Sequence, residues 1–284
     1  MYIKSELHYY KQSYSMDQFY TKPDIAKQCY QILNEELDIR NYDILMEPSA
    51  GTGSFFNLLP QDKRIGIDLE PKCDGVGEGN FLDFEANREL TYLIVGNPPF
   101  GKVCSLAVKF FNKAALFANA IAFIVPRTFK RASIWNKLDK HFHLVKNFDL
   151  SLKPCCFEPS MSAKCCFQVW VKKECVRSRI IYNKTHKDFS FLKLGPLDKN
   201  KQPTPPTGAD FVVKAYGGNC GEIVKDGLDT LRPKSWHWIK SNIAIDTLVS
   251  RIGQLDFSMS KDTVRQDSIG QQELIFLYEN CFGA

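Results

Sequence analysis

The stretch DILMEPSAGTGSFFNLL, residues 43–59, joins a short apolar run to a glycine turn and then to a second apolar segment. The first run has the density of apolar residues that is typical of a buried strand, and a Pro-Ser pair ends it. Gly51 and Gly53 allow the backbone to turn sharply and to approach a ligand closely. The pattern predicts a strand, a glycine turn and the start of a helix, which together open an α/β sheet.

Further strand-like runs follow along the chain and alternate with helix-like segments. They lie at 64–71, 93–99, 120–126, 143–150 and 165–173. Residues 103–120 have apolar side chains at helical spacing and sufficient length for a helix. Nearly all-apolar strands that are separated by helices indicate a parallel sheet covered on both faces. We therefore expect a Rossmann-like α/β domain.

The character of the sequence changes after about residue 172. Residues 194–210 are dense in Pro, Gly and polar side chains, as in a loop or linker. The remaining sequence mixes strand-like and helix-like pieces with several aromatic residues. We expect two parts, residues 1–172 and a smaller α+β region over residues 173–284.

Composition narrows the class of protein. The 284 residues carry a net charge of +5, and no apolar run approaches the ~20 residues that a membrane helix requires. The first twelve residues contain no apolar segment of the signal-peptide kind, and the ten cysteines are unevenly spaced. These features predict a soluble intracellular protein with reduced thiols, in the cytoplasm or the nucleus. The Cys155–Cys156 and Cys165–Cys166 pairs are adjacent residues that point to opposite sides of a strand, so we expect no metal site.

The net charge conceals a reversal along the chain. Residues 31–100 contain 5 Lys or Arg against 13 Asp or Glu, whereas residues 101–150 contain 9 against 2. An acidic region suits a cationic small ligand, and a basic region suits a polyanion. Solvated helix faces of opposite sign would give the same counts.

Three acidic residues occur at or after successive predicted strands. Glu47 would repel a phosphate and attract a cationic ligand, and the turn lacks the third glycine or the lysine of phosphate-binding loops. Asp68 is placed to accept hydrogen bonds from both hydroxyls of a ribose, and Asp83 to meet the amine of an adenine ring. Each acid alone is typical of a solvated loop or a helix cap. In this order they predict a nucleoside pocket.

A second unusual stretch is YLIVGNPPFGK, residues 92–102, where an apolar strand ends in Asn, two prolines and Phe. Five segments occur in an order and spacing of their own: DQFYTKPDIAKQC (17–29), EPSAGTGSF (47–55), GIDLEP (66–71), GNFLDF (79–84) and NPPF (97–100). Through them, residues 17–172 resemble the S-adenosylmethionine-dependent N6-adenine nucleic-acid methyltransferases. The resemblance implies a seven-stranded sheet with helices on both faces, S-adenosylmethionine as cofactor, and a C-terminal region that recognises the target.

The resemblance also assigns cofactor-binding residues. They are Tyr20, Thr21, Glu47, Pro48, Ser49, Ala50, Gly51, Gly53, Asp68, Leu69, Asp83 and Phe84. The segment between Asp68 and Asp83 is short, so we expect the usual helix there to be truncated.

The implied catalytic residues are Asn97, Pro98, Pro99 and Phe100. The lone pair of an exocyclic amine is delocalised into the purine ring, which makes the nitrogen a poor nucleophile. If the Asn97 side-chain oxygen and the Pro98 carbonyl each accept one amine hydrogen, the lone pair is directed at the sulfonium methyl. Phe100, which replaces the commoner Tyr, would stack on the target base, and Phe157 is the candidate for a second aromatic contact.

The predicted partner is nucleic acid, with DNA favoured over RNA, and no membrane. It would bind through the basic segment 102–146 and the C-terminal region. Five cations of this segment alternate with aromatic residues: Arg127, Lys130, Arg131, Lys137 and Lys140. An amphipathic helix with a basic face would show the same pattern.

Three alternatives remain open. A base amino-methyltransferase could act on adenine or guanine of structured RNA. A protein-glutamine methyltransferase also uses Asn-Pro-Pro-aromatic, but typically has a helical domain ahead of the glycine motif, where this sequence has only about 40 residues. A catalytically inactive binding protein would not need the intact motif. Cytosine-N4 enzymes more often have Ser where Asn97 stands, so adenine is preferred to cytosine.

Overall fold

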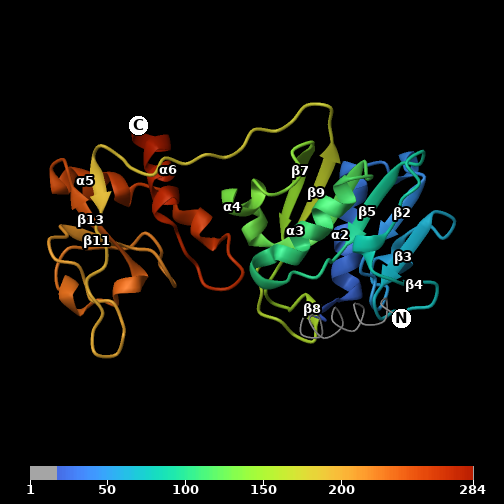
Figure 1. The fold of residues 1–284 in the computed structure, drawn as a ribbon, viewed down its shortest axis with the longest axis horizontal. Coiled ribbons are helices and arrows are strands. Elements are labelled where there is room, and N and C mark those ends of the chain that lie inside the picture. The colour runs from blue at the N-terminus through green and yellow to red at the C-terminus, as the bar shows by residue number, and fades with distance from the viewer. Residues whose placement is uncertain (1–17, 284) are drawn as a thin grey trace. The chain divides into compact units, whose positions relative to one another are not determined.

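The computed structural model describes residues 18–283, and the chain divides between Arg179 and Ile180 into two compact units (Figure 1). The prediction about the first twelve residues lies outside the described residues. Among the residues described, every helix is too short or too polar to cross a membrane. The packing divides the chain a few residues after the boundary at 172 and 173 that composition suggests.

The first unit is built on a seven-stranded sheet with the strand order β4-β3-β2-β5-β6-β9-β7. Its strands are β2 (Ile44–Glu47), β3 (Arg64–Asp68), β4 (Gly77–Glu78), β5 (Tyr92–Gly96), β6 (Ala120–Pro126), β7 (Phe142–Asp149) and β9 (Cys165–Lys172). Neighbours from β4 to β6 pair in parallel, and β9 is antiparallel to both β6 and β7. This order confirms the Rossmann-like seven-stranded sheet.

The chain reverses its winding direction between β2 and β5. From β2 it proceeds outward through β3 to β4, and it then returns to β5 on the other side of β2. Leu45 of β2 pairs with Arg64 of β3 and with Leu93 of β5, so the three strands end at one edge of the sheet. In open α/β sheets, ligands bind in the crevice at such a switch point.

Helices cover both faces of this sheet. Phe110 and Phe111 of α3 (Ser105–Ala115) pack with Met46, Ile94 and Phe123 in one hydrophobic cluster. Strand neighbours of these residues, among them Leu45, Leu93 and Ile124, are fully buried and point to the opposite face. There α2 (Pro23–Glu36) packs against β9, and Figure 1 shows α2 and α3 on opposite sides of the sheet.

The glycine turn differs from the sequence prediction. The segment after Gly53 forms a single 3-10 turn, Phe56–Leu58, in place of a helix. Only six residues separate Gly53 from Pro60, which cannot continue a helix, and so short a segment does not repay the cost of helix nucleation. The other 3-10 turns in the described chain are Ile39–Asn41, Phe81–Asp83, Lys102–Cys104, Arg127–Lys130, Leu228–Thr230, Pro233–Ser235 and Phe257–Lys261.

Two very short strands bring distant parts of the first unit together. β1 (Tyr20–Thr21) pairs with β8 (Phe157–Glu158) in antiparallel fashion, with Tyr20 opposite Glu158. The short helix α4 (Ala132–Trp135) follows β6 and its 3-10 turn.

The second unit is a smaller α+β fold, as predicted. Its strands β10 (Phe189–Phe191), β13 (Trp236–Ser241), β11 (Phe211–Lys214) and β12 (Ile223–Val224) form an antiparallel sheet in this order. The helices α5 (Ile245–Gly253) and α6 (Gln271–Phe282) pack on one face of it. Leu248, Ile252 and Leu274 of the helices form a core with Phe211 and Ile239 of the strands.

Candidate active site

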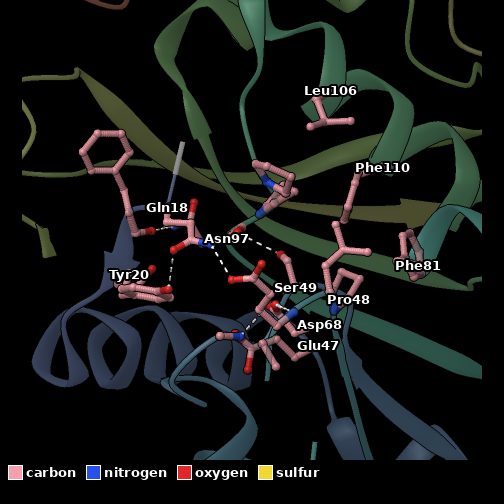
Figure 2. A pocket seen from close by; sticks show the side chains of 18 of the residues that line it. Gln18, Tyr20, Glu47, Pro48, Ser49, Asp68, Phe81, Asn97, Leu106 and Phe110 are labelled. Carbon is pink, nitrogen blue, oxygen red and sulfur yellow. Dashed lines mark hydrogen bonds between the residues drawn. The ribbon is translucent and has the colours of Figure 1, made fainter. Parts of the chain in front are cut away.

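A cavity of about 360 Å³ lies where β2, β3 and β5 end (Figure 2). Most of the residues predicted from the sequence line it: Tyr20, Thr21, Glu47, Pro48, Ser49, Ala50, Gly51, Asp68, Leu69, Asn97, Pro98, Pro99 and Phe100. Four predicted residues, Gly53, Asp83, Phe84 and Phe157, do not line it. Figure 2 shows Asn97 and Tyr20 on one side of the cavity and Phe81 and Phe110 on the other.

Asn97 follows the end of β5 and presents an unpaired acceptor. Its side-chain nitrogen donates to the carbonyl oxygen of Phe19 at 3.1 Å. Because a carbonyl can only accept, this contact fixes which end of the amide faces Phe19. The Asn97 Oδ1 atom is buried and has no hydrogen-bond partner in the structure. A buried polar atom without a partner is costly, and the site therefore holds an acceptor ready for a donor.

The backbone at Asn97 is also anchored. The Ser49 hydroxyl donates to the Asn97 carbonyl oxygen at 3.0 Å. Ser49 comes directly after β2 and Pro48, so this bond joins the ends of β2 and β5. The two strands thereby hold the Asn-Pro-Pro-Phe segment in place from both sides.

At Gly51 the glycine turn comes close to both Tyr20 and Asp68. The φ of Gly51 is +48°, and a Cβ placed there would lie 2.7 Å from a ring carbon of Tyr20. The Gly51 amide donates to Asp68 Oδ2 at 2.7 Å. Only glycine accepts this backbone conformation without strain while leaving room for the Tyr20 ring.

The Asp68 carboxylate is held by backbone donors at the end of β3. Oδ2 accepts from Gly51, and Oδ1 accepts from the Glu70 amide at 2.8 Å. Each carboxylate oxygen has a further lone pair, so both can still accept from hydroxyl groups of a ligand.

Glu47 is buried at the end of β2, with 2% of its surface exposed. Its Oε2 atom accepts from the Phe56 amide at 2.6 Å, which ties the glycine turn back to the strand. Burial raises the pKa of this carboxyl well above its ordinary value, although the amides of Phe56 and Phe55 act in the opposite direction. A cationic ligand nearby would favour the ionised form.

The N-terminal segment reaches the cavity through the β1–β8 pair. The Lys22 amide donates to the Cys156 carbonyl, and Ser54 Oγ donates to the Thr21 carbonyl at 2.6 Å. The Thr21 hydroxyl is buried and, like Asn97 Oδ1, has no partner in the structure. Both unpaired polar atoms belong to residues that line the same cavity.

Asp83 and Phe84 do not line the cavity, and their contact with a cofactor stays a prediction. Asn80 and Phe81, which follow β4 after Gly79, do line it. Asp83 Oδ2 accepts from Asn80 Nδ2 at 2.9 Å, so it holds the Asn80 side chain from outside the cavity. The position of residues 80 and 81 shortly after a strand is the signal that could have identified them.

Phe157 and Gly53 do not line the cavity either, and the base contact of Phe157 and the cofactor contact of Gly53 stay predictions. Phe157 is 1% exposed and meets the Phe100 ring edge-on, with 6.3 Å between the ring centres. It supports Phe100 and does not line the cavity. A Cβ at Gly53, whose φ is +79°, would lie 2.5 Å from the Cys73 sulfur, so Gly53 belongs to the packing of the turn.

Other lining residues were not identified from the sequence. They are Gln18, Phe19, Thr52, Ser54, Glu70, Gly79, Asn80, Phe81, Leu82, Leu106, Phe110 and Met161. Leu106 and Phe110 are one helical turn apart in α3, so helical spacing could have placed them on a common face. Gln18, Phe19 and Met161 come from irregular segments, where no periodic signal exists.

Part of the basic segment after residue 101 is paired within the fold. Lys130 contacts Asp149 at 2.6 Å, and Arg127 contacts the same carboxylate at 3.5 Å. Lys146 contacts Glu36 of α2 at 2.7 Å. The binding of phosphates by this segment stays a prediction.

All ten cysteines lie in the described part of the chain, where none forms a disulfide, and Cys166 belongs to the hydrophobic cluster beneath α3. Among the residues described, no group of three or more His, Cys, Asp or Glu side chains is arranged to hold a metal ion.

No family model matches the chain, and a search of curated proteins finds no match. Solved structures with a similar fold include PH1948 of Pyrococcus horikoshii, a suggested RNA methyltransferase, with 17% identity and a TM-score of 0.42 over 55% of this chain and 87% of that chain. The 23S rRNA methyltransferase ErmE has 14% identity and a TM-score of 0.39 over 55% and 70% of the two chains. The N-methyltransferase NodS of Bradyrhizobium japonicum WM9 has 13% identity and a TM-score of 0.37 over 52% and 96%.

Proposed function

We propose that the protein transfers a methyl group from S-adenosylmethionine to the exocyclic N6 of adenine in DNA. The observation that carries this proposal is the unpaired Asn97 oxygen at the end of β5, in a cavity that also contains the Asp68 carboxylate. The proposed substrate amine and the proposed cofactor would meet in that one cavity.

The chemistry of the cavity wall suits S-adenosylmethionine. Its described lining contains three acidic side chains, Glu47, Asp68 and Glu70, and no Lys, Arg or His. Asp68 and Glu70, together with Glu47 once a cation favours its ionised form, attract a cationic sulfonium compound and disfavour a cofactor that carries phosphates. By its charge, the cavity would therefore favour S-adenosylmethionine over an adenine nucleotide that carries phosphates.

Individual residues fit the parts of this cofactor. Asp68 can accept hydrogen bonds from the two ribose hydroxyls. Phe81 and Phe110 offer apolar surface for the adenine ring, with Asn80 beside them as a polar contact. The unpaired Thr21 hydroxyl can serve the amino-acid end, which would lie on the Asn97 side of the cavity.

The proposed mechanism depends on orientation more than on a strong base. Asn97 Oδ1 and the Pro98 carbonyl would each accept one hydrogen of the adenine amine and direct its lone pair into the cavity. When bound, S-adenosylmethionine supplies an electrophilic methyl group, whose carbon–sulfur bond breaks as the nitrogen–carbon bond forms. The methylated nitrogen then loses its extra proton to water.

Phe100 would hold the target base. Its ring stands on the edge of Phe157 and its carbonyl accepts from the Leu106 and Ala107 amides at the start of α3. These contacts fix the residue on which the base would stack after it leaves a duplex or is presented in a single strand. The second unit would then contribute target recognition.

Labelled S-adenosylmethionine presented separately to unmethylated DNA, RNA and a protein extract tests the proposal. We expect label in N6-methyladenine of DNA. The Asn97→Ala variant should incorporate this label at least about a hundredfold more slowly. Label in RNA alone would change the substrate to an RNA base, and label in protein alone would favour a side-chain amide and contradict the nucleic-acid proposal. Cofactor binding by Asn97→Ala, measured by calorimetry, shows whether the variant is folded.

A further inference from the structure

One face of the sheet in the second unit is buried by segments other than the two helices. Both α5 and α6 pack on the face that carries Phe211 and Ile239. Side chains alternate along a strand, so the opposite face carries Val212, Trp236 and Trp238. In the described chain this second face is covered mainly by loops and 3-10 turns, and Gln271, the first residue of α6, lies at its edge.

A groove with an apolar wall runs along this face. Trp236, Trp238 and Pro233 line it together with Leu192 and Leu194 from the segment after β10. The Trp238 indole N–H donates to the Pro233 carbonyl at 3.0 Å, which fixes this wall. Trp236 and Trp238 are 8% and 2% exposed, so they form the floor of the groove and do not project from it.

The charged groups at the groove have one sign. Lys193 and Lys234 are exposed and line it, and no acidic side chain does so within the described residues. Lys214 lies over the Trp236 ring, with its ammonium 4.3 Å from the ring centre. Lys234 also contacts Gln202 at 3.4 Å, which brings it to the loop that carries Lys201.

We propose that this groove binds a strand of nucleic acid, with phosphates at Lys193 and Lys234 and with sugar or base edges against Leu194, Pro233 and Trp236. Cations beside an aromatic and apolar floor match the alternation of charged phosphates and flat bases in such a strand. The inference rests on the proposed function and deepens it, because it gives the second unit a surface for the same substrate.

The test uses the full chain and short labelled oligonucleotides of DNA and RNA, each as single strand and duplex. Relative to the wild type, Lys193→Ala combined with Lys234→Ala should weaken binding about tenfold at low salt and reduce the salt-dependence slope by about two. Indole fluorescence should change when wild-type protein binds. Comparison of the four oligonucleotides shows which nucleic acid and which form the groove prefers.

Lys225→Ala is the matched control. Lys225 is also an exposed lysine of the second unit, but it contacts Asp246 of α5 at 3.1 Å, on the helix side. This variant should bind as the wild type does. Unchanged thermal unfolding of the double variant shows that its loss of affinity is not a loss of fold.

The two proposals fail in different ways. Wild-type affinity and salt slope in the double variant would overturn the groove proposal, even if methyl transfer to DNA is observed. An unchanged indole fluorescence when the wild type binds an oligonucleotide would overturn the groove proposal as well. Loss of affinity in the double variant without methyl transfer to any nucleic acid would overturn the proposed function and leave the groove as a nucleic-acid site.

Discussion

The Phe19 carbonyl oxygen accepts a hydrogen bond from the Asn97 side-chain nitrogen at 3.1 Å, and Asn97 Oδ1 is thereby left buried without a partner. Residues 19 and 97 are far apart in sequence. They meet because β1 pairs with β8 and because β5 ends at Gly96. The proposed catalytic acceptor is therefore oriented by the N-terminal segment, and a change of one atom in its side chain should disturb it.

Asn97→Asp replaces the amide nitrogen with an oxygen of similar size. An ionised carboxylate cannot donate to the Phe19 carbonyl, so the two oxygens repel each other and the acceptor loses its orientation. We expect methyl transfer to fall by about two orders of magnitude, with little change in cofactor affinity. Turnover and calorimetric binding measured on the same preparation check this. Wild-type turnover in Asn97→Asp would show that the contact with Phe19 is unnecessary.

Asp68→Asn should weaken cofactor binding. Both carboxylate oxygens accept from backbone amides, Gly51 at 2.7 Å and Glu70 at 2.8 Å, and an asparagine would turn a donor toward one of them. We expect about a tenfold rise or more in the dissociation constant for S-adenosylmethionine, since hydrogen bonds to charged groups contribute roughly 1.5–3 kcal/mol. Glu70→Gln is the control at the same cavity wall. Equal effects of the two substitutions would contradict a specific role for Asp68.

Two strand ends could be predicted because a proline stops the apolar run. The strand β2 ends at Glu47, directly before Pro48, and β5 ends at Gly96, two residues before Pro98. Parallel strands then bring their ends to one edge, so most of the site follows from the order of the runs. The seven-stranded sheet is confirmed, whereas its strand order is known only from the observed pairing.

Where local turns decide which side chains line the cavity, the sequence alone does not identify these side chains. Asn80 lines the cavity and Asp83 does not, because a 3-10 turn begins directly after Asn80. The exact start of such a turn decides which of its side chains faces the cavity. Phe157 is buried because the β1–β8 pair turns it against Phe100. Neither effect has a periodic pattern, since both arise from contacts between distant segments.

Glu47 should make stability depend on pH. Burial raises the pKa of its carboxyl above the unfolded value of about 4.5, so the folded state binds the proton more tightly. Stability from this group is present below that value and is lost as the pH rises from 4.5 through the raised pKa, at up to about 1.4 kcal/mol per pH unit. Urea unfolding at several pH values should show this decline in the wild type and a smaller one in Glu47→Gln. Parallel pH curves for the two proteins would contradict the assignment to Glu47.

Val103 is strained at the rim of the site. It lies between the lining residues Phe100 and Leu106, has a φ of +52°, and is 75% exposed. A β-branched residue in the left-handed region is unfavourable, and so exposed a side chain gains little from packing in return. Val103→Gly should therefore raise the free energy of unfolding by roughly 0.5–1 kcal/mol, because the relief of strain exceeds the added entropy of the unfolded chain.

Val145→Gly provides the comparison for that substitution. Val145 is also an exposed valine, at 41%, and it lies in β7 at the register shift between Leu144 and Lys146, but it is not among the residues with positive φ. Glycine within a strand costs roughly 0.5–1 kcal/mol, so this variant should be less stable than the wild type. Urea unfolding gives the free energy of unfolding of both variants relative to the wild type. A loss of stability in Val103→Gly equal to that in Val145→Gly would show that residue 103 is not strained, because only strain at the wild-type residue gives the two substitutions opposite signs.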